Sequence, residues 1–150
     1  MSAVLNPVWS LKLVRESYPK YQIKGLTDVM DVIKTHIAPK LVESNIERFF
    51  FIGMNNRNKI IIIEEHTKGS INSSTVYIPE IAKKLLLCNC NSVIFIHNHP
   101  SGQLEFSSCD LTITDRLKNA LELFDIRVLD HILVGENTDK FISLAERGAL

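Results

Sequence analysis

The chain of 150 residues has the length of one ordinary domain, and 45% of its residues are hydrophobic, enough for a substantial core. Lys and Arg together number 17, as do Asp and Glu, so the formal net charge is zero. This balance gives no support to a nucleic-acid partner, because nucleic-acid-binding domains normally carry a strongly basic face.

The cysteine content and the hydropathy pattern predict a protein of a reducing, aqueous compartment. Cys88, Cys90 and Cys109 form an odd, sparse set, which fits free thiols better than a disulfide framework. The first residues lack the basic and apolar regions of a secretory signal, and no apolar run approaches the roughly 20 residues of a membrane span. We therefore expect a cytoplasmic protein with no membrane association.

The start of the chain predicts an extension followed by a helix. Residues 1–26 form the extension, and the alternation over residues 9–14 would suit an edge strand. Thr27 is a candidate N-cap, and the apolar residues after it recur at helical spacing. A helix is therefore expected to begin at Thr27 and to end before Pro39.

The next segment predicts a β-hairpin. Residues 47–54 and 59–66 have the composition of strands, and the asparagine-rich residues 55–58 between them are typical of a turn. Both strands are almost continuously apolar, which indicates that both of their faces are covered.

The second half alternates helices and strands. A helix should begin near Pro79, a residue that suits the first helical position, and a longer one should follow over residues 107–124. Strands are expected at residues 92–97, 126–134 and 140–144. The order predicts an α/β (α+β) domain in which helices cover a mixed sheet. Its exposed strand edges would allow a homodimer.

The residues that follow the strand at 92–97 carry the chemistry. His97 and His99 stand two residues apart, so on an extended chain their side chains project to the same face. Asp110, at the start of the next helix, supplies a third ligand. Two imidazoles and one carboxylate favour zinc, and three protein ligands leave one position open for water, as in catalytic sites. We expect one Zn²⁺ per chain.

Several of these residues have a second interpretation that the sequence leaves open. Ser107 and Asp110 have the spacing of a capping box, so Asp110 either binds the metal or caps the helix, and Ser107 either caps or also donates to an oxyanion. His131 lies within a predicted strand and is expected to be a satisfied core residue rather than a fourth ligand. Cys88 and Cys90 fit buried thiols better than a metal pair.

The order His97-x-His99, seven residues, then Ser107-x-x-Asp110 resembles the JAMM motif of the JAB/MPN metalloprotease superfamily. The local sequence HNHPSG at residues 97–102 resembles the RadC-like branch in particular. The resemblance covers residues 27–150, and four further stretches agree with it, at residues 47–49, 69–73, 129–132 and 141–144.

This resemblance implies a cytidine deaminase-like fold, a curved mixed sheet flanked by helices. It implies a zinc-dependent hydrolase that cleaves peptide or isopeptide bonds. The metal would be held by His97, His99 and Asp110, and the oxyanion would be stabilised by Ser107. The residue that opens the early strand, Glu47, would be the general base that activates the attacking water.

The chain departs from the branch at two points. RadC-like proteins often carry a helix-hairpin-helix before this domain, and residues 1–26 are too short for one, so DNA binding by that route is not expected. Phe106 stands where a proline is expected, which should alter the loop rather than the ligands. Two alternatives to a hydrolase remain, a DNA-repair-associated protein and a non-catalytic binding module that the metal only stabilises.

Overall fold

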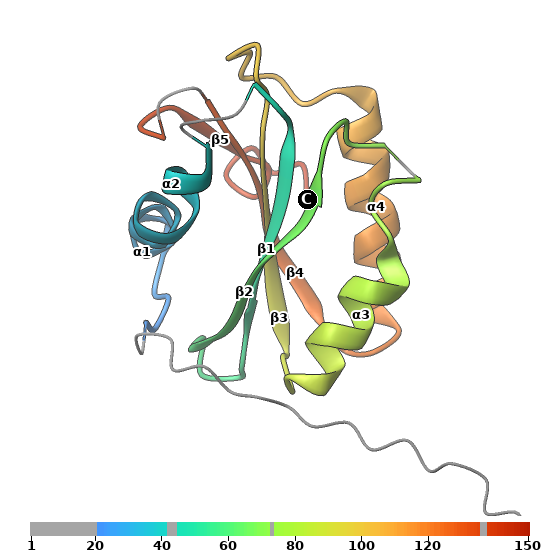
Figure 1. Ribbon diagram of the computed structural model, residues 1–150. Coiled ribbons are helices and arrows are strands. Elements are labelled where there is room, and N and C mark those ends of the chain that lie inside the picture. The colour runs from blue at the N-terminus through green and yellow to red at the C-terminus, as the bar shows by residue number, and fades with distance from the viewer. Residues whose placement is uncertain (1–20, 42–44, 73, 136–137) are drawn as a thin grey trace, which may run out of the picture.

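The computed structural model describes residues 21–41, 45–72, 74–135 and 138–150, and these form one five-stranded sheet with helices on both faces (Figure 1). The expected mixed sheet flanked by helices is therefore confirmed. The edge strand expected within residues 9–14 lies outside the described residues. Among those described, no helix is both long and apolar enough to cross a bilayer.

The sheet has the strand order β2-β1-β3-β4-β5. All neighbours pair antiparallel except β3 and β4, which are parallel, and the helix α4 makes the crossover between them. The strands are β1 (Arg48–Met54), β2 (Ile60–Lys68), β3 (Ser92–Asn98), β4 (Arg127–Val134) and β5 (Phe141–Ser143).

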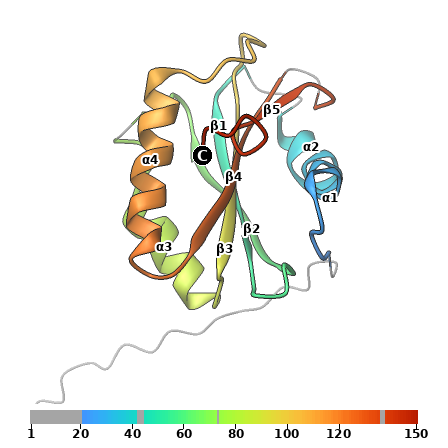
Figure 2. The same cartoon turned by 180° about the vertical axis from the view of Figure 1, so that it is seen from behind.

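Two helical layers sandwich the sheet, as the opposite views in Figures 1 and 2 show. Helix α1 (Leu26–Val32), the π-helical turn η1 (Ile33–Ile37) and α2 (Ala38–Leu41) cover one face. Helices α3 (Ile78–Leu87) and α4 (Ser108–Glu122) cover the other.

Strand β1 contributes to both hydrophobic cores. Phe50 and Ile52 pack under α1 and η1, whereas Phe49 and Phe51 pack under α3 and α4. All four side chains are almost completely buried, which explains why the sequence of this strand is continuously apolar rather than alternating. The prediction that both faces of β1 are covered is therefore correct. Strand β2 is different, because it is an edge strand and most of its residues are only half-buried.

The first helical segment differs from the expectation at both ends. It begins at Leu26, with Gly25 rather than Thr27 as its N-cap, and helical structure continues past Pro39 to Leu41. The π-helical turn η1 ends at Ile37, and Pro39 is the second residue of α2. A proline is tolerated in the first turn of a helix, so helical structure continues past it.

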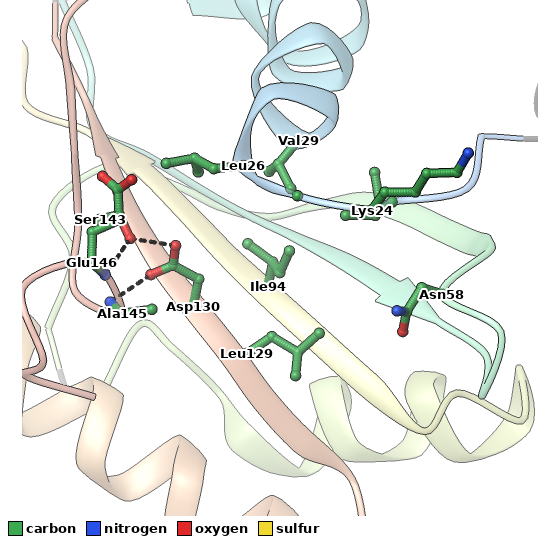
Figure 3. A pocket seen from close by; sticks show the side chains of 12 residues that line it. Lys24, Leu26, Val29, Asn58, Ile94, Leu129, Asp130, Ser143, Ala145 and Glu146 are labelled. Atoms are coloured by element: carbon green, nitrogen blue, oxygen red, sulfur yellow. Dashed lines mark hydrogen bonds between the residues drawn. The ribbon is translucent and has the colours of Figure 1, made fainter.

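The C-terminal turn is attached to β4 through a buried carboxylate (Figure 3). Asp130 accepts hydrogen bonds from the Ala145 amide, at 3.0 Å, and from the Ser143 hydroxyl, at 2.6 Å. The Ser143 oxygen in turn accepts from the Glu146 amide. These residues border a pocket of about 290 Å³ between α1 and the sheet, on the face away from α4.

A glycine in β1 allows α3 to pack closely on the sheet. A Cβ atom at Gly53 would lie 2.7 Å from methyl groups of both Ile62 and Leu85 and 2.8 Å from the Cys90 sulfur. We expect Gly53→Ala to destabilise the fold by about 1–3 kcal/mol, as overpacked core substitutions do. Urea unfolding would measure the change. Gly25→Ser is the control, since no atom lies within 4 Å of that position, and an equal loss in both variants would contradict the packing argument.

The stability should also depend on the protonation of His66. Its Nε2 atom accepts a hydrogen bond from the Tyr77 amide at 3.1 Å, which only the neutral imidazole can do. Burial, and then the charge of Lys84, lower the pKa of His66 below its usual value of 6.5. Since the unfolded chain binds the proton more readily, the stabilisation is present above pH 6.5 and is lost as the pH falls below it.

Wild type should have a higher free energy of unfolding than His66→Gln. We expect this difference to be larger at pH 7.5 than at pH 5. Urea unfolding at the two pH values measures this difference. A difference that does not change with pH would show that His66 stabilises the fold only by packing.

Candidate metal centre

The central strand β3 carries the first histidine of the motif into the core. Every residue of β3 is buried, and His97 is 1% exposed. His99 follows the end of the strand on the same face. The Nε2 atoms of the two rings lie 3.2 Å apart, so the i and i+2 spacing brings the imidazoles together as expected.

Asp110 reaches the same point from the first turn of α4. Its Oδ1 atom lies 3.5 Å from Nε2 of His97, and its Oδ2 atom lies 3.2 Å from Nε2 of His99. The capping box is also present: Oδ2 accepts hydrogen bonds from the Ser107 amide and hydroxyl, both at 2.7 Å, and the Asp110 amide donates to the Ser107 oxygen. Capping occupies Oδ2 and leaves Oδ1 directed at His97, so capping and metal binding are compatible.

The atoms that converge at this point suit a cation. Ligand atoms of His97, His99 and Asp110 all lie within 4.8 Å of one another. Nδ1 of His99 lies 3.1 Å from the carbonyl oxygen of Gln103, which only accepts, so Nδ1 carries a proton. In the neutral form of this ring the lone pair of Nε2 faces the cluster, 3.2 Å from Oδ2 of Asp110. The group could thus hold a metal ion, and a set of two imidazoles and one carboxylate fits zinc.

Protonation in the cluster also suits metal binding. Burial lowers the pKa of His97, and the hydrogen bond and charge of Asp110 offset this only in part. For Asp110, burial acts to raise the pKa, but His97 and the bonds from Ser107 outweigh it and hold the pKa below its ordinary value. Burial thus favours the neutral form of His97, and the neighbours of Asp110 favour its ionised form. These are the forms in which the two residues bind metals.

Behind His97 lies a third histidine whose contact the sequence did not predict. His131 of β4 is 1% exposed, and its Nε2 atom lies 2.8 Å from Nδ1 of His97. Its other nitrogen lies 2.6 Å from the Thr114 hydroxyl of α4. His131 is outside the group of metal-binding candidates, and both of its nitrogens have partners, in agreement with the core interpretation. Burial, and then His97, push the pKa of His131 well below its ordinary value.

Glu47 lies just before β1, on the face of the sheet that carries the histidines. Phe49 pairs with His97 across the two strands, and the same register continued by two residues sets Glu47 opposite His99. The Glu47 oxygen Oε2 accepts a 2.7 Å hydrogen bond from the Ile71 amide. The Oε1 atom has no hydrogen-bond partner among residues 21–41, 45–72, 74–135 and 138–150.

Asn98 holds the backbone on either side of Glu47. Its Oδ1 atom accepts a hydrogen bond from the Arg48 amide, at 2.8 Å, and its Nδ2 atom donates to the Ile46 carbonyl, at 3.2 Å. Asn98 stands between the two histidines of the motif, so on the strand its side chain faces away from them. Through these bonds the motif itself positions the start of β1, fifty residues earlier in the chain.

The three cysteines take no part in the cluster. All three are free thiols. Cys90 is buried as expected, whereas Cys88 is only half-buried. Burial, and then the nearby Cys88, raise the pKa of Cys90 to about 12. Cys109 is half-buried and its sulfur lies 3.8 Å from the Ile71 carbonyl, which leaves it outside the metal-binding group.

Comparison with known proteins agrees with this geometry. A family model described as RadC-like JAB domain matches residues 23–149. Two similar proteins bear the name UPF0758 protein, from Cellvibrio japonicus and Vibrio cholerae. The first is 39% identical over 91% of this chain and 60% of its own length, the second 44% identical over 77% and 71%.

A third relative, UPF0758 protein Smlt0399 of Stenotrophomonas maltophilia, is 46% identical over 69% of this chain. The match covers 44% of that relative, so the chain spans only about half the length of some of the proteins it resembles. The family match covers nearly all of the described structure and includes every residue of the His-His-Asp group. The chain belongs to the RadC-like JAB domain family.

Proposed function

We propose that this domain is a zinc-dependent hydrolase that cleaves a peptide or isopeptide bond. The observation that carries the proposal is the convergence of two imidazole nitrogens and one carboxylate within 4.8 Å, with Glu47 on the same face of the sheet. Three protein ligands leave a coordination position open, which is typical of catalytic rather than structural zinc sites. Zinc bound there would lower the pKa of a water ligand and polarise the substrate carbonyl.

Glu47 is the general base in this proposal. The Ile71 amide holds Oε2 and thereby orients the carboxylate, which leaves Oε1 to take the proton from the attacking water. Glu47 would then return that proton to the leaving amine nitrogen as the amide bond breaks. The half-buried position of Glu47 suits this exchange, because the carboxylate is both positioned by the protein and accessible to a substrate.

Ser107 is proposed to stabilise the oxyanion in addition to capping α4. Its hydroxyl proton is directed at Asp110 Oδ2, and the side chain is exposed beside the cluster. Donation to an oxyanion requires the hydroxyl to rotate and to give up that 2.7 Å bond. The Ser107 amide keeps its own bond to Oδ2, so the cap would persist in part during such a rotation.

The proposal predicts one zinc per chain, dependent on the cluster. His99→Ala and Asp110→Asn should each lose the metal, because each removes one of three ligands while Asn keeps an oxygen at the cap. Elemental analysis after zinc loading and desalting would measure the stoichiometry. His36→Ala is a matched control, since His36 lies in η1 on the opposite face of the sheet. Wild-type protein without zinc, or His99→Ala with a full equivalent, would contradict the site.

The second prediction separates the base from the metal ligands. Glu47→Gln should bind zinc like wild type and lose about 10²–10⁴-fold in hydrolysis, the range that general bases contribute. The amide oxygen of Gln can still accept the Ile71 bond, so the loop is retained. The assay is a library of fluorogenic peptides and lysine isopeptides with zinc-loaded protein.

Glu105→Gln is the control for this experiment, because it removes one exposed negative charge from the loop beside Phe106. It should hydrolyse the substrates at the wild-type rate. If Glu47→Gln retains that rate as well, the assignment of the base is wrong, even where zinc binding is unchanged.

A further inference from the structure

A chain of buried hydrogen bonds runs from α4 through β4 to the back of His97. The Thr114 hydroxyl lies 2.7 Å from the backbone carbonyl of Asp110 and 2.6 Å from Nδ1 of His131. Nε2 of His131 lies 2.8 Å from Nδ1 of His97. Thr114, His131 and His97 are each no more than 3% exposed, so water does not compete for these bonds.

The donor and the acceptor of each hydrogen bond in this series follow from the bond between the Thr114 hydroxyl and the Asp110 carbonyl. A carbonyl oxygen only accepts, so the Thr114 hydroxyl gives its single proton to the Asp110 carbonyl. The Thr114 oxygen must then accept from His131, which places the ring proton of His131 on Nδ1. The rings of Phe49, Phe95 and Phe106 surround His131, and so apolar a setting favours the neutral imidazole.

A neutral imidazole carries one proton, so Nε2 of His131 is an acceptor, and its partner, Nδ1 of His97, is the donor. The Nδ1 proton of His97 therefore faces the core, and in the neutral ring the lone pair of its Nε2 atom faces His99 and Asp110. The opposite tautomer of His97 would direct an N–H group at the metal position and could not bind a cation there.

We propose that Thr114 and His131 are positioning residues that fix the tautomer and ring orientation of His97 for metal binding. This inference rests on the proposed metal site and adds residues that neither coordinate the metal nor touch the substrate. Such outer partners typically change metal affinity about 10–100-fold when they are removed. Phe106 packs against both rings, at centroid distances of 5.4 Å from His97 and 5.1 Å from His131, and shields the bond between them.

The test removes the Thr114 hydroxyl, which sets the donor and acceptor roles along this series of hydrogen bonds. Thr114→Val keeps the shape of the side chain and leaves Nδ1 of His131 without an acceptor. Thr114→Ser restores the hydroxyl. Thr112→Val is the matched control, because the exposed Thr112 makes the same bond to the carbonyl four residues earlier on α4, to Ser108 at 2.8 Å, without contacting a histidine.

The first measurement is ¹⁵N-edited NMR of the histidine rings in metal-free protein, which distinguishes protonated from unprotonated ring nitrogens. His97 should be protonated on Nδ1 alone in wild type, Thr114→Ser and Thr112→Val, and should populate both tautomers in Thr114→Val. The second is zinc affinity by competition with a chelator. It should fall about 10–100-fold in Thr114→Val and stay within about 3-fold of wild type in the other two.

The inference is overturned if Thr114→Val keeps the single tautomer of His97, or if its zinc affinity equals that of Thr112→Val. His131→Phe provides a second variant that keeps an aromatic ring in the core but removes both ring nitrogens, and it should give the same mixture of tautomers. Because NMR reads the tautomer without metal, it tests the positioning role even if wild-type protein fails to bind zinc. That failure would instead contradict the proposed function.

Discussion

The position of β3 between β1 and β4 is the constraint on which the site depends. A central strand is hydrogen-bonded on both edges, so His97 has fixed neighbours on either side. The antiparallel pairing with β1 brings Phe49 and the segment of Glu47 to one side, and the parallel pairing with β4 brings His131 to the other. A slip of one residue in either pairing would turn these side chains to the opposite face.

The local sequence pattern was sufficient to predict some parts of the site. The spacing of His97 and His99 determined that both face one way, because alternation is a property of any extended chain. The capping residue before α4 could be located in the same manner, since Ser107 and Asp110 act within one helical turn. Such features depend on residues close in sequence, and pattern analysis is strongest there.

Contacts between distant segments could not be predicted in this way. Glu47 was assigned only through the resemblance to a family, because its placement needs the register of β1 on β3. The contact of His131 with His97 depends on a parallel register that shifts between Val93 and Ile94, and no local signal encodes that irregularity. Helical structure likewise continues past Pro39, after a π-helical turn that the sequence pattern did not indicate.

The two oxygens of Asp110 link the folding of α4 to the chemistry of the cluster. One oxygen caps the N-terminus of α4 by accepting hydrogen bonds from the Ser107 amide and hydroxyl, and the other faces His97. The positive end of the helix dipole stabilises the same negative charge that a cation would require. A substitution that weakens the first turn of α4 would therefore misplace a ligand, and occupation of the cluster would strengthen that turn. The stability of the first turn of α4 and the affinity of the cluster for a cation are therefore thermodynamically coupled.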